Sequence, residues 1–354
     1  MAGLGSELAG LSGRGWSRAV AALVLTAAGA VACGSSEPSG PSTAQCRAAV
    51  PKPASARSIA AGPPVVPAHG AYLGAFALNG TVFTQEQYIA STAELEVAIC
   101  HPIAIVHSYL QWAKPFPTDS QLATVKAGQM LLISWTGTDL ATMASGADDA
   151  EIRDVAAEVA SLRAPVFLEL RWEMDRPNLA SVVHGPATFI AAWDHTRQIF
   201  AAAGVTNASW VWCPTATGFE RGTAQQYYPG AAEVDWICTD AYPDPVGPEE
   251  QLSHEISSFL GWARSQGKPL MLGEIGVPES YPSDVRAQWI TNAAEFIRKT
   301  PQIKAAVYFD YNPVGHSSNR DYAIGPGSPA AEALRQVASD PWFNPSKPTA
   351  VRSP

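Results

Sequence analysis

The sequence has little charge, and the charge that it has is mainly negative. Asp, Glu, Lys and Arg make up 16% of the 354 residues, whereas about 25% is typical of soluble domains. The formal net charge is −9, and Lys and Arg form no cluster in the body of the chain. Because polyanion binding depends on neutralising phosphates with these two residues, nucleic acid is not an expected partner.

Two short motifs are also missing, and each absence excludes a class of chemistry. No C-x-x-C pair occurs, so neither redox nor zinc chemistry is suggested. No G-x-S-x-G occurs, so a serine hydrolase is not supported. His107, His184, His195 and His316 lack a carboxylate or Ser partner at a motif spacing, and we expect them to be ordinary surface or core residues. We therefore expect no metal and no cofactor.

The sequence also lacks a hydrophobic run long enough to span a bilayer, which takes about 20 residues. The apolar run Ala19 to Ala32 follows Arg14 and Arg18 and ends at Cys33. This pattern is typical of a signal peptide, and its end resembles a bacterial lipobox, which implies cleavage before Cys33 and lipidation of its thiol. Residues 1–33 are therefore predicted to be a lipoprotein signal peptide that leaves the protein anchored on the extracellular face of the membrane. Ordinary secretion, with Cys33 as a spare thiol, is the alternative.

The rest of the chain divides by composition. Residues 34–67 are rich in Ser, Pro, Gly and Ala and are predicted to be a disordered tether, because they cannot bury enough apolar surface to fold. One folded domain is expected over 68–345, followed by a flexible tail over 346–354. The apolar fraction of 47% is ample for its core, and no internal repeat divides it. We expect this domain to be a monomer.

Four cysteines follow the lipobox, and an even number in an exported protein permits two disulfides. Cys213 and Cys238 fall on consecutive predicted strands, so they are expected to pair with each other. Cys46 is then paired with Cys100 by elimination.

From about residue 68 the chain alternates short apolar runs with longer amphipathic stretches, the pattern of repeated βα units. The candidate strands are Ala71–Leu78, Ile103–Leu110, Met130–Trp135, Pro165–Glu173, Ala208–Cys213, Val234–Tyr242, Pro269–Gly276 and Ala305–Tyr311. The candidate helices are Thr84–Val97, Asp148–Leu162, Pro186–Ala203, Pro248–Gln266 and Ser283–Lys299. An open doubly wound sheet has the same alternation, but no G-x-G-x-x-G loop follows the first strand. Eight units in one run predict a single-domain (β/α)8 barrel, a TIM barrel.

The fourth candidate strand carries an unusual number of charges. In FLELRWEMD, alternation places Glu169, Arg171, Glu173 and Asp175 on one face. Barrel strands are ordinarily apolar on both faces, so this face is expected to lead to the active-site mouth at the carboxyl end. Glu169 and Arg171 lie deeper, and the plainer interpretation of these two is a buried ion pair that supports the site.

The seventh candidate strand, PLMLGEIG, holds one charge, Glu274, which alternation places on the face of Leu270 and Leu272. Glu173 and Glu274 are then expected across one lumen, where two carboxyl groups can flank a glycosidic bond. One group must hold a proton and the other must be ionised; burial and their mutual repulsion can separate the two pKa values.

Several stretches together resemble glycoside hydrolase family 26, the β-mannanase-related family, and most closely its exported actinobacterial lipoprotein branch. The matching stretches are ELRWEMD, WVWCPT, YYPGAAEVDWICTDAY, KPLMLGEIGVP, IKAAVYFDYN and DYAIGPGSPAAEALRQVASDPWF. They span about residues 70 to 343 in order. The resemblance implies that Glu173 is the acid/base and Glu274 the nucleophile of a retaining mechanism.

The resemblance also implies roles for neighbouring residues. Arg171 would orient the Glu173 carboxylate or help to keep Glu274 ionised, and Tyr242 would donate its hydroxyl to Glu274. The sugar-stacking walls have as candidates Trp135, Trp212 and Tyr308. For these aromatic residues a place in the core is an equally good interpretation, since most Trp in a barrel simply pack.

One departure bears on the substrate. The family usually reads His-Glu-Met-Asn-Gly, whereas this chain has Trp172, Glu173, Met174, Asp175 and Arg176. The missing His ordinarily touches substrate beside the acid/base; Trp172 could stack or donate an indole N–H, but it cannot act as an imidazole.

The sequence therefore predicts a retaining endo-β-glycosidase that acts on mannan, glucan or a related polysaccharide. The alternative is a non-catalytic, polysaccharide-binding barrel lipoprotein; retention of both glutamates favours the enzyme, and loss of the His favours the binder slightly. A solute-binding lipoprotein would need two lobes and a hinge, which a single run of eight units does not provide.

Overall fold

The computed structural model describes residues 41–50, 61–80, 83–246, 248–313 and 321–345. Cys33, the predicted signal peptide and the predicted tail lie outside these residues, as does His316. Within the described residues, no helix is both long and apolar enough to cross a membrane.

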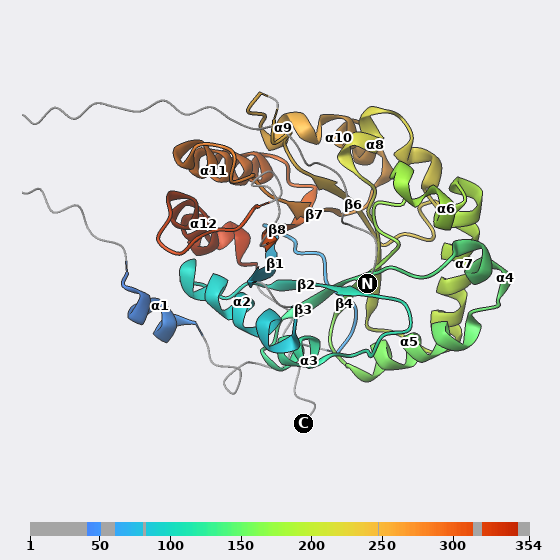
Figure 1. Cartoon of the computed structure of the whole chain (residues 1–354). Coiled ribbons are helices and arrows are strands. Elements are labelled where there is room, and N and C mark those ends of the chain that lie inside the picture. Colours follow the sequence, from blue (N-terminus) through green and yellow to red (C-terminus); the bar gives the residue numbers. More distant parts are fainter. Residues whose placement is uncertain (1–40, 51–60, 81–82, 247, 314–320, 346–354) are drawn as a thin grey trace, which may run out of the picture. The chain divides into compact units, whose positions relative to one another are not determined.

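Eight parallel strands close into one barrel in the order of the chain, with β8 hydrogen-bonded to β1 (Figure 1). The strands are β1 Tyr72–Gly80, β2 Ile105–Leu110, β3 Met130–Trp135, β4 Val166–Leu170, β5 Ala208–Trp212, β6 Trp236–Ala241, β7 Leu270–Ile275 and β8 Ile303–Pro313. The predicted (β/α)8 barrel is confirmed, and the open doubly wound sheet is excluded.

Helices alternate with the strands and surround them (Figure 1). They are α2 Gln85–Ala98, α3 Asp119–Lys126, α4 Leu140–Ser145, α5 Asp149–Ser161, α6 Ala180–Val183, α7 Pro186–Ala202, α8 Ala216–Glu220, α9 Leu252–Glu255, α10 Ser257–Ala263, α11 Ser283–Lys299 and α12 Pro329–Ser339. Single 3-10 turns form at η2 Pro177–Leu179, η3 Ala224–Tyr227, η4 Arg264–Gln266 and η6 Pro341–Phe343. The long helix predicted over 248–266 is instead broken into α9, α10 and η4.

Local sequence explains where several helices begin. Thr84 and Ser328 cap α2 and α12 by accepting a hydrogen bond from a backbone N–H of the first turn. Thr118 and Gln121 form a reciprocal capping box at the start of α3. These caps satisfy N–H groups that would otherwise have no partner inside the helix.

Two separate groups of buried side chains result from the alternation along the strands. The larger group lies between the barrel and its helices. The smaller fills the lumen and consists of Tyr72, Ile105, Met130, Leu132, Phe167, Val211, Cys213, Trp236, Cys238, Met271, Ala305 and Val307. A packed lumen is usual for this fold and leaves the carboxyl end of the strands for the site.

Both predicted disulfides are present. Cys213, directly after β5, bonds to Cys238 within β6, with 4.3 Å between their Cα atoms. Cys46 bonds to Cys100 from helix α1, Thr43–Ala49, which begins with a capping box at Ser42. The prediction that residues 34–67 are entirely a disordered tether is therefore wrong over α1, because composition alone does not register the capping signal at Ser42, and the expected Cys46–Cys100 bond joins this helix to Cys100.

Candidate active site

The turn after β4 carries Glu173. The strand ends at Leu170, earlier than predicted, because Arg171 and Glu173 adopt left-handed backbone conformations with φ of 50° and 52°. The predicted shared face therefore does not continue past Glu169. Two backbone bonds hold the turn: Arg171 N donates to Trp135 O at 2.8 Å, and Glu173 N donates to Cys213 O at 2.7 Å. Such conformations cost free energy in residues other than Gly and persist where the surroundings fix them.

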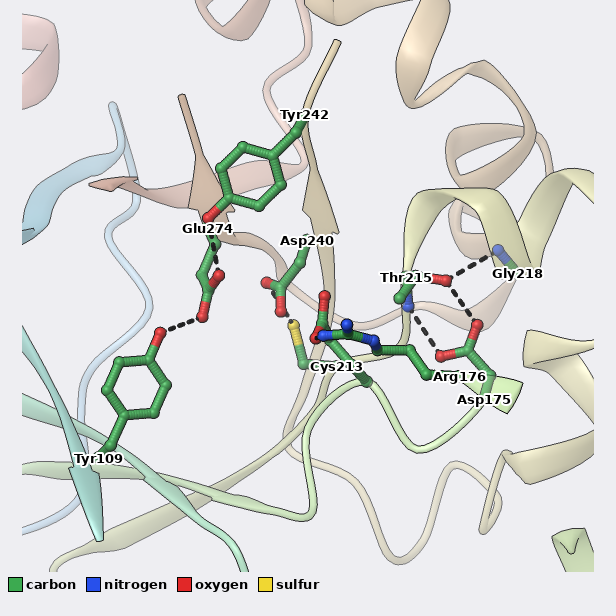
Figure 2. A network of polar contacts seen from close by, with 10 residues as sticks. Tyr109, Asp175, Arg176, Cys213, Thr215, Gly218, Asp240, Tyr242 and Glu274 are labelled. Atoms are coloured by element: carbon green, nitrogen blue, oxygen red, sulfur yellow. Dashed lines mark hydrogen bonds and ion pairs between the residues drawn. The ribbon is translucent and has the colours of Figure 1, made fainter. Parts of the chain in front are cut away.

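Asp175 fastens the same turn to the next βα loop. Its carboxylate accepts hydrogen bonds from Thr215 N at 3.0 Å and from Thr215 Oγ1 at 2.6 Å (Figure 2). Thr215 in turn caps α8 by accepting from Gly218 N at 2.9 Å. A Cβ on Gly218 would lie 1.7 Å from Asp175 Oδ2, so a larger residue would displace this carboxylate.

A bulge in β7 brings Glu274 into the lumen. Opposite β6, Thr239 pairs with Leu272 but Asp240 pairs with Glu274, so that Gly273 is an extra residue. Leu270 and Leu272 lie in the outer core. The prediction that Glu274 shares their face is wrong, because an inserted residue reverses the alternation beyond it.

Gly273 is required at this bulge for space. A Cβ there would lie 2.6 Å from Cys238 Sγ, 2.7 Å from Asp240 Oδ1 and 2.9 Å from Cys213 Sγ. The bonded sulfurs cannot swing aside as a flexible side chain would. The interior disulfide and the position of Glu274 are therefore coupled through one missing side chain.

Replacing Gly273 with Ala is expected to destabilise the protein by about 1–3 kcal/mol, because it overpacks a rigid part of the lumen. Denaturant unfolding measures the effect. The matched control is Gly261→Ala in α10, where a Cβ meets nothing within 4 Å; there the change should be neutral or stabilising by about 0.5–1 kcal/mol. Equal effects at the two positions would contradict this account.

Two tyrosine hydroxyls donate to the Glu274 carboxyl group. Tyr242 donates to Oε2 at 2.7 Å, which confirms the predicted hydrogen bond, and Tyr109 donates to Oε1 (Figure 2). Burial and the nearby charge of Glu173 nevertheless raise the pKa of Glu274 to about 7, against the lowering effect of the two tyrosines. Sequence reasoning missed Tyr109, although alternation along β2 places it on the lumen face with Ile105 and His107.

Arg176 is the partner of Glu173. Its Nη1 lies 2.5 Å from Glu173 Oε2. Burial raises the pKa of Glu173, and the charge and hydrogen bond of Arg176 oppose that rise. Arg171 was predicted to orient the Glu173 carboxylate or to keep Glu274 ionised. It instead donates from Nη1 to Thr136 O at 2.9 Å, because its left-handed backbone takes it out of the alternation of the strand. Sequence reasoning noted Arg176 only as a departure from the family pattern.

Glu169 does not form the expected buried ion pair with Arg171. It accepts a hydrogen bond from Ser134 Oγ at 2.5 Å, and Ser134 Oγ lies 2.7 Å from His107 Nε2. Burial raises the pKa of Glu169 to about 8 and lowers that of His107 to about 3. Both groups are thus neutral near pH 7, which is how buried titratable groups avoid the cost of an uncompensated charge.

Asp240 completes the cluster of carboxyl groups. It is buried, and its pKa is raised well above the ordinary value by burial and then by Glu274 and Glu173. Its Oδ1 lies 3.3 Å from Cys213 Sγ. Glu169 Oε1 similarly lies 3.8 Å from Cys238 Sγ. Because both sulfurs are bonded to each other, this grouping of carboxylate and sulfur offers no thiolate to a metal.

The three aromatic candidates for sugar-stacking walls all lie in the outer core. Trp135 packs against Trp112, Trp212 packs against Phe219 and Trp262, and Tyr308 donates its hydroxyl to Tyr322 O at 3.0 Å. Each is at most 2% exposed, so the interpretation as core holds and the stacking role is wrong. Trp172 differs: it is partly exposed, with its ring 5.0 Å from that of Tyr109.

The chain was compared with protein-family models and with known proteins. No family model matches it. The chain is 27% identical over 296 residues to Endoglucanase H of Acetivibrio thermocellus, an alignment that covers 78% of this chain and 32% of that protein. The chain thus spans about a third of the length of this curated relative.

Solved structures share the barrel. The catalytic domain of a GH26 endo-β-1,4-mannanase from Bacillus sp. JAMB-750 matches with a TM-score of 0.61 at 15% identity, over 78% of this chain and 88% of that one. A GH26 β-mannanase from Bacteroides ovatus matches with a TM-score of 0.59 at 12% identity, over 88% and 97%. At such identities the likeness shows the fold alone. The chain is thus similar in sequence to an endoglucanase and shares its barrel with solved GH26 mannanases.

Proposed function

We propose that this chain is a glycoside hydrolase of family 26 that cleaves internal β-linkages of mannan, glucan or a related polysaccharide with retention of configuration. Glu173 is the acid/base and Glu274 the nucleophile. The observation that carries the proposal is that Glu173, in the turn after β4, and Glu274, near the end of β7, lie at the same end of one parallel barrel, where two tyrosine hydroxyls hold the Glu274 carboxyl group.

The reaction takes two displacements. In the first, the Glu173 proton passes to the glycosidic oxygen as its bond to the anomeric carbon breaks, while a Glu274 oxygen bonds to that carbon. In the second, Glu173 takes a proton from water, the water oxygen attacks the anomeric carbon, and the bond to Glu274 breaks. This mechanism requires the two carboxyl groups to lie about 5–5.5 Å apart in the working enzyme.

The activity is expected to depend on pH in a bell shape. At low pH Glu274 gains a proton and cannot attack, and at high pH Glu173 loses the proton that the leaving group needs. The raised pKa values of both groups place this bell above the range of ordinary carboxyl groups.

Hydrolysis of a panel of β-glycans tests the proposal. Mannan, glucomannan and mixed-linkage and unbranched β-glucans are incubated with the protein, and new reducing ends are measured. For any active substrate, proton NMR of the first product shows whether the β-anomer forms. Inversion would overturn the mechanism, and binding without hydrolysis of any glycan would favour the polysaccharide-binding lipoprotein.

We also propose that the protein is exported and held at the outer face of the membrane by lipid on Cys33, as in the actinobacterial lipoprotein branch. The apolar run that ends at Cys33 supports this. Replacing Cys33 with Ser is expected to move the protein from the membrane fraction to the medium on cell fractionation. Unchanged membrane retention would contradict the anchor.

A further inference from the structure

We infer that Arg176 is a positioning residue for the reaction, whose guanidinium fixes the Glu173 carboxyl group and supplies a positive charge that acts on both Glu173 and Glu274. The inference rests on the proposed function, and it adds a residue for which the family resemblance provides no role, since the family pattern has Gly there.

The geometry of the turn carries the inference. Arg176 Nη1 and Glu173 Oε2 are 2.5 Å apart, and the Arg176 backbone N–H donates to Glu173 O at 3.0 Å. The Glu173 side chain is 14% exposed and that of Arg176 is 49% exposed, so the cation reaches the carboxylate from the solvent side. Asp175, between them, is fastened to Thr215, which fixes the turn from which Arg176 extends (Figure 2).

The surrounding groups make this cation unusual. Titratable side chains from β2, β4, β6 and the turns after β4 and β6 face the two glutamates, and they are Tyr109, Glu169, Asp175, Asp240 and Tyr242. The guanidinium of Arg171 donates its hydrogen bond to Thr136 O instead. Among the described residues, the Arg176–Glu173 contact is the one ion pair within this cluster.

The charge would serve both displacements. When Glu173 gives up its proton, Arg176 stabilises the carboxylate that forms. In the second displacement the same charge keeps Glu173 ionised, which is the form that takes a proton from water. The same charge lowers the pKa of Glu274 and thereby keeps more of the nucleophile ionised. Arg176 thus sets the pH range over which the pair is correctly protonated.

The pH dependence of kcat/KM tests this role. With Arg176→Gln, both limbs of the bell should move to higher pH, and kcat/KM on the alkaline limb should rise about fivefold, the factor typical of one half-exposed charge pair. Arg176→Lys keeps the charge and should restore most of the wild-type profile. The matched control is Arg335→Gln in α12, which removes another arginine that pairs with a glutamate three residues earlier; its profile should not move.

Two further measurements test the same role. In the wild type, 1 M NaCl should reproduce part of the shift, because salt screens a half-exposed pair. The ¹³C shift of the Glu173 carboxyl carbon, assigned by its loss in Glu173→Gln, should titrate at higher pH in Arg176→Gln, whether or not any glycan is cleaved. A hydrolysing enzyme whose profile and carboxyl titration do not change with Arg176→Gln would overturn the inference alone. A shifted titration in a protein that hydrolyses no glycan would show that Arg176 holds the Glu173 carboxylate but would overturn the proposed function and, with it, a role in the reaction.

Discussion

Replacing Glu274 with Ala is expected to lower kcat by about 10⁴- to 10⁶-fold on every substrate, because no other group can form the bond to the anomeric carbon. The loss should be similar for activated and unactivated leaving groups, since both need the nucleophile. Initial rates with a polysaccharide and with a dinitrophenyl β-glycoside measure it.

The matched control is Glu332→Ala, which removes an exposed carboxylate from α12 and should leave kcat unchanged. Circular dichroism and the unfolding midpoint establish that Glu274→Ala still folds; removing a buried carboxyl group whose pKa is raised should not destabilise the protein strongly. Residual activity above about 1% of wild type in a pure, folded preparation would contradict the nucleophile assignment.

Replacing Glu173 with Ala is expected to affect substrates unequally. Hydrolysis of a polysaccharide should fall by about 10²- to 10⁴-fold, the usual contribution of general acid–base catalysis. Formation of the glycosyl-enzyme from a dinitrophenyl β-glycoside should change little, because that leaving group departs without a proton. Comparison of burst and steady-state rates separates the two steps, and equal damage to both substrates would rule out the acid/base role.

Azide provides an independent check on the same variant. It needs no general base, so it should attack the glycosyl-enzyme of Glu173→Ala, raise the steady-state rate and yield a β-glycosyl azide. The same addition to Glu274→Ala should yield no such product, because no glycosyl-enzyme forms. If a folded Glu173→Ala protein that binds sugar gives no azide product, the binding-protein alternative gains support.

The fold could be predicted because its signals are local and repeated. Strand β3 and helix α11 occupy the predicted residues, and most other elements differ by one or a few residues at their ends. The boundaries that were wrong depend on backbone conformations that composition does not reveal. Alternation in FLELRWEMD gave no sign that Arg171 and Glu173 would adopt left-handed conformations and end β4 early.

Of the residues that make up the candidate site, the sequence predicted Glu173, Glu274, Tyr242 and Trp172. The bulge at Gly273 reverses the alternation in β7. It is visible only in the way that β7 pairs with β6 and with β8. The aromatic residues expected to form the sugar-stacking walls point away from the lumen, one residue along the strand from a side chain that faces it. Ser134, next to Trp135, faces the lumen and bonds to Glu169. Applying the alternation consistently would have moved attention from Trp135 to the lumen-facing side chains.

The remaining contacts depend on tertiary structure. Arg176 meets Glu173 because a turn of fixed shape brings residues three apart together, and Asp240 joins the cluster because β6 and β7 are neighbours in the barrel. Sequence spacing gives neither distance. The resemblance to family 26 could not help with Arg176, since the family pattern has no side chain at that position.

The crowding of carboxyl groups at the barrel mouth couples folding to the uptake of protons. Burial raises the pKa values of Glu169 and Glu274 to about 8 and 7, whereas in the unfolded chain these groups titrate near about 4. Groups whose pKa rises on folding contribute stability that is fully present below about pH 4 and is lost as the pH rises through about 7 to 8. The burial of these carboxyl groups therefore makes the folded state more stable in mildly acidic than in alkaline surroundings.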